Sequence, residues 1–268
     1  MFYKVAGIFL DIYGAKLKNR EWERFCYQYD ASDSINAEIE FLNYTNLGIY
    51  TNLEMFDDFQ SGDKLIRREE DIMLVRNNWS YARIFPLRNP ENEDAFIIHI
   101  FYSHAVQRKM LQVHSSLIRF RGKGVLFLGR SGIGKTTQAE LWQQYNDALI
   151  INGDMNFIQK ENARFRAWGT PWHGSSPYCE NTSVPVHAMI VLKQAPDNSI
   201  RELTGFEKVS AVSNNVFYPR WLENGMELCL ETLDHLLRAV PVYELSCRPD
   251  EEAVRITEEA VFGGRFSV

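Results

Sequence analysis

The sequence has 268 residues, 45% of them hydrophobic and 24% charged, so it can bury the core of a globular protein. Its formal net charge is −6 and its basic residues form no long run, which argues against a nucleic-acid-binding surface. No apolar stretch approaches ~18 residues, and Asp11 and Tyr13 stand where a leader peptide would carry a small-residue cleavage site. We therefore expect a cytoplasmic protein without a membrane span.

The four cysteines lie far apart and form no C-x-x-C pair. They are Cys26, Cys179, Cys229 and Cys247. This spacing argues against a disulfide framework and against a structural zinc site, and it favours a reducing compartment. We expect all four to be small buried hydrophobic residues.

The first hundred residues predict a small α+β region. Residues 2–13 alternate loosely as a strand does, 20–29 suit a short helix, and 43–66 predict loops and short strands. Asn and Pro clusters separate three apolar runs, which predict antiparallel strands at 71–76, 80–86 and 95–102. Residues 103–112 predict a helix.

The second half begins with a predicted hairpin, 113–120 and 124–129, around the turn Arg121-Gly122-Lys123-Gly124. A helix should then begin inside a glycine-rich loop and run to Tyr145, followed by a strand at 148–152.

After that strand the chain returns to hairpins instead of continuing the strand–helix alternation of a doubly wound domain. The predicted elements are a hairpin of 157–160 and 164–169, a strand at 186–193, a helix at 222–238, a strand at 241–247 and a helix at 249–261. We therefore predict a mixed α/β fold whose sheet is not purely parallel.

The glycine-rich loop matches the phosphate-binding pattern G-x-x-x-x-G-K-[ST] in full. Its residues are Gly129, Arg130, Ser131, Gly132, Ile133, Gly134, Lys135 and Thr136, and Thr137 follows. The glycines let successive backbone amides face one concavity at a helix start, which favours anions. Lys135 supplies a charge for the β and γ phosphates, and the Thr136 hydroxyl is a ligand for Mg²⁺. These nine residues predict a site for ATP or another nucleoside triphosphate with Mg²⁺.

Four stretches resemble the catalytic domain of HPr kinase/phosphorylase and its relatives, which share a fold with phosphoenolpyruvate carboxykinase. They are His114-Ser115, the run GVLFLGRSGIGKTT, the run ALIINGDMNFI, and GTPWHG followed by VHAMIVLKQA, together about 112–196. The resemblance implies a phosphoenolpyruvate carboxykinase-like mixed sheet with a P-loop. We accordingly divide the chain into an N-terminal α+β region, 1–105, packed on the core, and a nucleotide-binding domain, 106–268.

In that family a strand after the glycine-loop helix ends in two aspartates, one of which takes the proton of the acceptor hydroxyl. Gly153 stands at the first of these positions and Asp154 at the second. Asp154 is thus the candidate base and, with Thr136, a candidate metal ligand. Alternatively, Asp154 is a turn residue after Asn-Gly.

Other candidate residues rest on the same resemblance. His114 matches a histidine that faces the transferred phosphate, although a lone histidine before a strand is often a packing residue. In the loop Gly169–Gly174 and just after it, Trp172, His173 and Ser175 are candidates for lining a substrate pocket; the alternative is a loop anchored on the sheet by its aromatic residue. Arg201 and Arg220 are further candidates for compensating transition-state charge.

These residues favour three functions in order. The first is a kinase in which Asp154 is the base, His114 and Lys135 assist, and the acceptor is a serine-like hydroxyl on a peptide, protein or small molecule. The second is a catalytically inactive nucleotide-binding module, which Gly153 favours, and the third is a phosphorolytic or carboxykinase-type enzyme. The sequence predicts no nucleic-acid or membrane partner and leaves homo-oligomerisation open.

Overall fold

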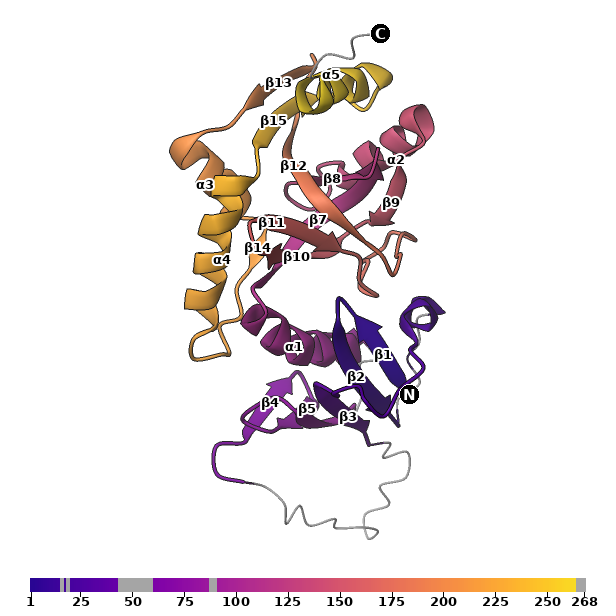
Figure 1. Cartoon of the computed structure of the whole chain (residues 1–268), viewed down its shortest axis with the longest axis vertical. Helices are drawn as coiled ribbons and strands as arrows, with labels where there is room; N and C mark the ends of the chain where they lie inside the picture. Colours follow the sequence, from indigo (N-terminus) through magenta and orange to yellow (C-terminus); the bar gives the residue numbers. More distant parts are fainter. Residues whose placement is uncertain (15–16, 18–19, 43–59, 87–90, 264–268) are drawn as a thin grey trace. The chain divides into compact units, whose positions relative to one another are not determined.

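The computed structural model of the chain describes residues 1–14, 17, 20–42, 60–86 and 91–263 (Figure 1). By its internal contacts the chain divides into two compact units, Met1–Ala105 and Val106–Val268. Each unit contains a sheet with both parallel and antiparallel neighbours, so the protein is of the mixed α/β class.

Within the described residues, the sheet of the first unit has six strands, in the order β1-β2-β3-β6-β5-β4. They are β1 (Phe2–Val5), β2 (Ile8–Tyr13), β3 (Ala37–Phe41), β4 (Lys64–Arg68), β5 (Asp71–Val75) and β6 (Tyr81–Phe85). Strand β3 is parallel to both of its neighbours, β2 and β6, and the remaining pairs are antiparallel.

Two sequence predictions within the first thirty residues need correction. The predicted strand 2–13 is a hairpin, because Ala6 and Gly7 have φ values of 47° and 74° and reverse the chain. The predicted helix 20–29 is the shorter 3-10 helix η1 (Arg20–Phe25). Of the segment predicted as loops and short strands, 43–59 lies outside the described residues.

The largest error concerns the apolar run 95–102, which was predicted as a strand and lies inside the helix α1 (Glu91–Gln107). A short apolar run cannot by its periodicity be assigned to a strand rather than to a buried helix. Phe96, Ile97, Ile100 and Phe101 are all buried. The helix is held to its unit by polar contacts, such as Asn92 Nδ2 donating to Asp71 Oδ2 at 2.8 Å.

The sheet of the second unit has the order β11-β10-β7-β8-β12-β15-β13, and β9 and β14 pair with β7 beside this path. Its strands are β7 (Met110–Phe120), β8 (Lys123–Leu128), β9 (Leu149–Asn152), β10 (Met155–Glu161), β11 (Arg164–Trp168), β12 (Ser183–Gln194), β13 (Ser199–Glu202), β14 (Val216–Phe217) and β15 (Val242–Cys247). Strand β12 is parallel to β8 and to β15, whereas β7 and β8 are antiparallel. The prediction of a sheet that is not purely parallel is confirmed.

Four helices complete the described part of this unit: α2 (Lys135–Asn146), α3 (Gly205–Ser213), α4 (Gly225–Ala239) and α5 (Glu251–Phe262). The hairpins and the helices α2, α4 and α5 lie where the sequence predicted them. Strand β13, helix α3 and strand β14 were missed. The predicted helix 103–112 is also wrong, since α1 ends at Gln107 and β7 begins at Met110.

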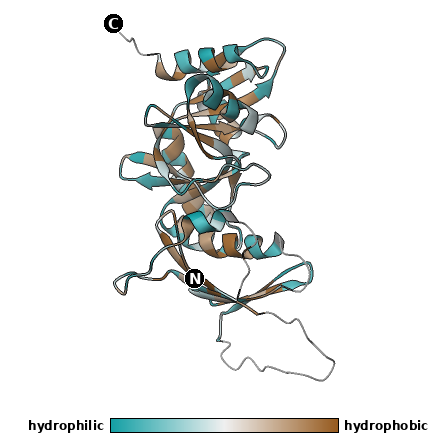
Figure 2. Cartoon of the chain, turned by 90° about the vertical axis from the view of Figure 1, so that its right-hand side faces the viewer, coloured by the Kyte–Doolittle hydropathy of each residue, from teal (hydrophilic) through white to brown (hydrophobic). Residues whose placement is uncertain are grey.

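The core beside the glycine-rich loop lies between the sheet and the helices α2 and α5. Trp142 of α2 is buried there with Phe127 of β8 and Val254 of α5. Figure 2 shows hydrophilic and hydrophobic segments alternating along the helix nearest the C-terminus, as a helix with one buried face requires. This packing fixes the start of α2 against the end of β8.

The described part of the chain contains no helix that is both long and apolar enough to cross a bilayer. No disulfide joins the four cysteines. Cys179, Cys229 and Cys247 are buried as predicted, but Cys26 is exposed, so that expectation was wrong for one of the four.

Candidate functional site

The glycine-rich loop connects β8, which ends at Leu128, to α2, which begins at Lys135. Gly129, Gly132 and Gly134 have φ values of 143°, 77° and 110°. L-residues rarely adopt these conformations, so the pattern of glycines follows from the backbone path. At Gly129 a side chain would also meet Ile133, whose Cγ2 lies 3.0 Å from the position of a Cβ.

The first turn of α2 has unpaired backbone amides. Gly134 is the N-cap residue, and no side chain caps the helix. Among the described residues, no acceptor receives a hydrogen bond from the amides of Lys135, Thr136 or Thr137, and Gln138 is the first residue whose amide bonds back, to Gly134 O at 2.9 Å. Unpaired amides at the positive end of a helix form an anion-binding site.

The ammonium of Lys135 lies beside these amides. The residue is 6% exposed, and its Nζ donates to Gly129 O at 3.0 Å and to Arg130 O at 3.3 Å. Burial lowers the pKa of Lys135, and the charge of Asp154 opposes that shift. A cation held in this way would gain from a bound anion.

Strand β7 changes its neighbours at its midpoint, and the other site residues gather there. On one side its partner changes from β10, which pairs up to His114, to β9, which pairs from Leu117 onward. On the other side the partner changes from β14 to β8, whose last residue pairs with Ser115. The turn between β9 and β10 and the end of β8 therefore both lie beside residues 114–116.

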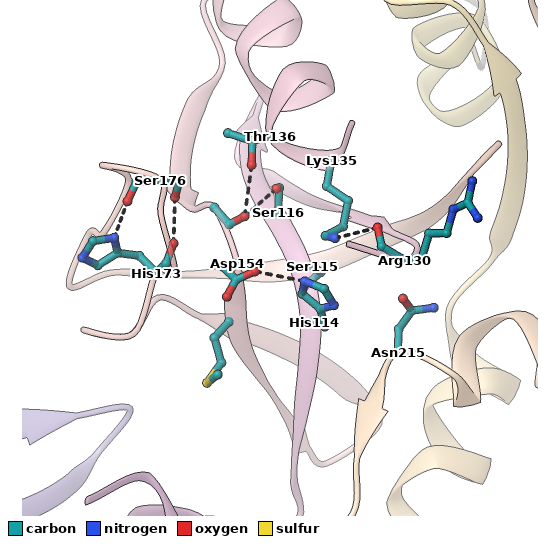
Figure 3. A network of polar contacts seen from close by, with 12 residues as sticks. His114, Ser115, Ser116, Arg130, Lys135, Thr136, Asp154, His173, Ser176 and Asn215 are labelled. Atoms are coloured by element: carbon teal, nitrogen blue, oxygen red, sulfur yellow. Dashed lines mark hydrogen bonds and ion pairs between the residues drawn. The ribbon is translucent and has the colours of Figure 1, made fainter. Parts of the chain in front are cut away.

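This arrangement brings His114 and Asp154 together. Asp154 lies in the turn between β9 and β10, and its backbone oxygen accepts from Ser115 N at 2.9 Å. Nε2 of His114 lies 3.0 Å from Asp154 Oδ1, and both side chains are partly exposed (Figure 3). The hydrogen bond from His114 lowers the pKa of Asp154; burial opposes this, while the charges of His114, Lys135 and His173 add to it. Asp154 is thus an ionised carboxylate at neutral pH.

Asn152, which sequence reasoning missed, shapes the turn that carries Asp154. The side chain is fully buried, and its Oδ1 accepts from the amides of Asp154 and Met155, both at 2.9 Å. Its Nδ2 donates to the backbone oxygens of Thr170 and Trp172 at 2.9 and 3.0 Å. One buried amide therefore ties the Asp154 turn to the loop after β11. An Asn before Gly is a common turn residue, so no sequence signal distinguishes this role.

Gly153 is held where no larger residue fits. A Cβ at this position would lie 2.0 Å from Ser176 Oγ and 2.6 Å from Ser176 Cβ. The Gly153 oxygen accepts from the hydroxyls of Ser116 at 2.8 Å and Thr136 at 3.4 Å. An aspartate at this position, as in the resembling family, would require the segment around Ser176 to move.

The loop after β11 places its three candidate residues differently. Trp172 is 7% exposed and packs near Phe157, with ring centroids 6.4 Å apart, so its indole lies in the core as the alternative interpretation expects. His173 is half-buried, and its Nδ1 contacts Ser176 O. Ser175 is exposed. Gly174 lies against Asp154, since a Cβ there would lie 2.7 Å from Asp154 Oδ2.

Two candidate oxygen ligands for Mg²⁺ lie near the Gly153 turn. The Thr136 hydroxyl donates to Gly153 O at 3.4 Å, and Asp154 is the next residue along the chain; Mg²⁺ accepts a few such oxygens while keeping several waters. Within the described ranges, no group of three His, Cys, Asp or Glu residues converges as a metal site.

A cavity of about 570 Å³ lies beside the start of the loop and is lined by His114, Gly129, Arg130 and Asn215, among others. Asn215, which was also missed, is buried before β14, and its Oδ1 accepts from Gly129 N at 2.9 Å. Its backbone oxygen accepts from His114 N at 2.8 Å. Asn215 thus links the loop to the His114 strand. The missed elements α3 and β14 position it.

Of the two arginine candidates, Arg201 lies on β13 and pairs with two carboxylates, Glu207 at 2.8 Å and Glu244 at 3.2 Å. Arg220 is exposed in the segment before α4. Figure 3 instead shows Lys135, His114 and Asp154 as one group, with Arg130 beside Lys135 and Asn215 on the other side of His114 from Asp154.

The structure therefore defines a mixed α/β protein with a strand–glycine loop–helix unit beside a histidine–aspartate pair. A family profile described as SynChlorMet cassette protein ScmC matches residues 93–249, more than half of the chain. The chain belongs to the ScmC family.

Among solved structures, the HPr(Ser) kinase/phosphatase from Coxiella burnetii is similar with a TM-score of 0.34 and 12% identity, over 57% of this chain and 93% of that one. This is a distant structural likeness. No curated protein matches the sequence.

Proposed function

We propose that this protein is an ATP- and Mg²⁺-dependent kinase of the HPr kinase-like group that phosphorylates a hydroxyl group on a peptide, protein or small molecule. The observation that carries the proposal is the run of unpaired amides at Lys135, Thr136 and Thr137 beside the buried Lys135 ammonium. These groups are suited to a polyphosphate, because each amide and the ammonium can donate to a phosphate oxygen.

The His114–Asp154 pair supports phosphate transfer rather than binding alone. The lowered pKa keeps Asp154 ionised at neutral pH, and an ionised carboxylate can accept the proton of an acceptor hydroxyl as the hydroxyl oxygen attacks the γ-phosphorus. The bond from the γ-phosphorus to the β-γ bridging oxygen then breaks, and the nucleoside diphosphate leaves. His114 holds the carboxylate in place through its hydrogen bond.

Thr136 and Asp154 are the residues that would hold Mg²⁺. Bound Mg²⁺ would neutralise charge on the β and γ phosphates. Lys135 adds its ammonium from the loop side, so that the protein supplies mainly position and positive charge, which phosphoryl transfer requires.

The test has two parts. Calorimetry should detect binding of ATP with Mg²⁺, and γ-labelled ATP should then label a compound in pools of hydroxyl-bearing peptides and small molecules. Absence of heat with any nucleotide and Mg²⁺ would rule out the proposal.

A second candidate is a catalytically inactive nucleotide-binding module whose N-terminal unit contacts a partner. Gly153 favours it, because the packing of Ser176 leaves no room for a second carboxylate at that position. The labelling experiment separates the two candidates: nucleotide binding without transfer to any acceptor supports the module and contradicts the kinase.

A further inference from the structure

A second cavity, of about 190 Å³, lies where the phosphate-binding loop meets the carboxyl ends of two parallel strands. Gly134, Thr137 and Gln138 line it from the loop and from α2, and the ends of β12 and β15 close it. In open α/β sheets ligands bind outside the carboxyl ends of parallel strands. The cavity adjoins Thr137, whose backbone amide is one of the unpaired donors described above.

The wall of this cavity contains a buried amide group with one unpaired atom. Gln138 is 3% exposed, and its Nε2 donates to Cys247 Sγ at 3.4 Å. Its Oε1 is buried and accepts no hydrogen bond from any residue that the structure describes. Burial raises the pKa of the Cys247 thiol to about 11, so the sulfur is uncharged at neutral pH. An unpaired buried acceptor lowers stability, and such groups are rare unless they have a role.

We propose that this cavity receives the base of the nucleotide and that Gln138 selects a base with an exocyclic amino group, such as adenine. The inference rests on the proposed nucleotide site and specifies its base. The amino group supplies the hydrogen-bond donor that Gln138 Oε1 lacks. A half-turn of the terminal amide about χ3, which is a soft torsion, would exchange Oε1 with Nε2 and place the oxygen beside Cys247, which also lines the cavity.

The size of the cavity agrees with this assignment. A volume of 190 Å³ equals the share of about six water molecules in the liquid, at ~30 Å³ each. This is room for a flat heterocycle but not for a whole nucleotide. The phosphates would lie outside the cavity, along the amides of Lys135–Thr137.

The experiment compares the affinities of three compounds in the full chain with Mg²⁺: ATP, purine riboside triphosphate and inorganic tripolyphosphate. The first two differ only in the 6-amino group. We expect ATP to bind about tenfold more tightly than purine riboside triphosphate, because one neutral hydrogen bond contributes about the 1.4 kcal/mol that a factor of ten represents. Tripolyphosphate reports on the loop alone.

Gln138→Leu should remove the difference between the two nucleotides and leave the affinity for tripolyphosphate unchanged. The matched control is Gln144→Leu, which changes an exposed glutamine of the same helix and should preserve the tenfold preference. The unchanged affinity for tripolyphosphate also verifies that the Gln138 variant is folded.

Two results would overturn the inference in distinguishable ways. Equal affinity of the unaltered protein for ATP and purine riboside triphosphate, with tripolyphosphate bound, would refute base selection and leave the phosphate site standing. Failure of all three compounds to bind would refute the nucleotide site itself. The first comparison needs no variant, so it remains decisive even if Gln138→Leu does not fold.

Discussion

The glycine-rich loop and the histidine–aspartate pair lie side by side but are built in opposite ways. The loop is one continuous segment, Gly129–Thr136, whose conformation follows from three glycines with positive φ. The pair joins the middle of β7 to a turn after β9, and Asn152 and Asn215 hold the surrounding segments. The loop is therefore set by local chemistry, and the pair by tertiary structure.

This difference explains how each of the two regions should respond to a substitution. The loop presents amides that are unpaired within the described residues and are available to a ligand. The turn at Gly153 is densely packed, with its oxygen accepting two hydroxyl hydrogen bonds and Ser176 filling the space beside its Cα. A substitution in the loop should therefore change mainly binding, and one in the turn mainly catalysis or stability.

The largest expected effect is that of Asp154→Asn on phosphate transfer. Removing a general base costs about 10²–10⁴-fold in rate. The asparagine has nearly the same shape but cannot accept the proton of the acceptor hydroxyl. The measurement is the initial rate of transfer from γ-labelled ATP, alongside the affinity for ATP without Mg²⁺, which should change little.

Asp147→Asn is the matched control, since Asp147 is the exposed residue that ends α2. It should transfer phosphate at the rate of the unaltered protein. A normal rate in Asp154→Asn would remove Asp154 from the mechanism.

The next effect tests the loop. Lys135→Ala should weaken binding of ATP about 10–100-fold, because a charged hydrogen bond contributes about 1.5–3 kcal/mol and each 1.4 kcal/mol is a factor of ten. Calorimetry gives the affinity directly. Lys123→Ala, at the opposite end of β8, should bind normally. Equal loss in both variants would mean that the effect is one of net charge rather than of the loop.

The same difference between the glycine-rich loop and the histidine–aspartate pair explains which elements could be predicted from the sequence. The loop, the hairpin of β7 and β8, and helix α2 were predicted because glycine spacing and apolar periodicity are local signals. Helix α1 was mistaken for a strand because its apolar run is buried on most sides. Asn215 was missed because α3 and β14 before and after it were not predicted.

Gln138 and Gly153 show a second limit of prediction from the sequence. A glutamine in the first turn of a helix looks like a surface residue, and only packing reveals that it is buried beside Cys247. Gly153 could be read as the loss of a family aspartate, but its close approach to Ser176 depends on a contact between segments far apart in the chain. No spacing rule encodes such contacts.

The close approach of Gly153 to Ser176 gives the third prediction. Gly153→Ala should lower the free energy of unfolding by about 1–3 kcal/mol, the usual cost of overpacking. The reason is that the new Cβ would lie 2.0 Å from Ser176 Oγ. Urea unfolding gives the value.

The double variant Gly153→Ala/Ser176→Gly tests the cause of that loss. It should recover part of the stability, because the clash is removed while only one hydroxyl hydrogen bond, to His173 O, is lost. Additive losses in the double variant would show that Ser176 is not the obstacle.

The smallest expected effect concerns pH. His114→Leu should raise the pKa of Asp154, because the hydrogen bond from His114 is the largest cause of its lowering. Carboxyl NMR titration measures this, with Asp154→Asn assigning the signal.

The lowered pKa of Asp154 also determines how the stability of the protein changes with pH. An ionised Asp154 stabilises the fold above the ordinary Asp pKa of about 3.9, and this contribution is lost as the pH falls through its folded pKa. The stability difference between the unaltered protein and His114→Leu should therefore narrow as the pH falls through the range in which Asp154 is protonated. His235→Leu, on α4, should show no such narrowing. If the stability difference between the unaltered protein and His114→Leu did not depend on pH, His114 would act by packing alone. The hydrogen bond between His114 and Asp154 would then contribute nothing to the ionisation of Asp154.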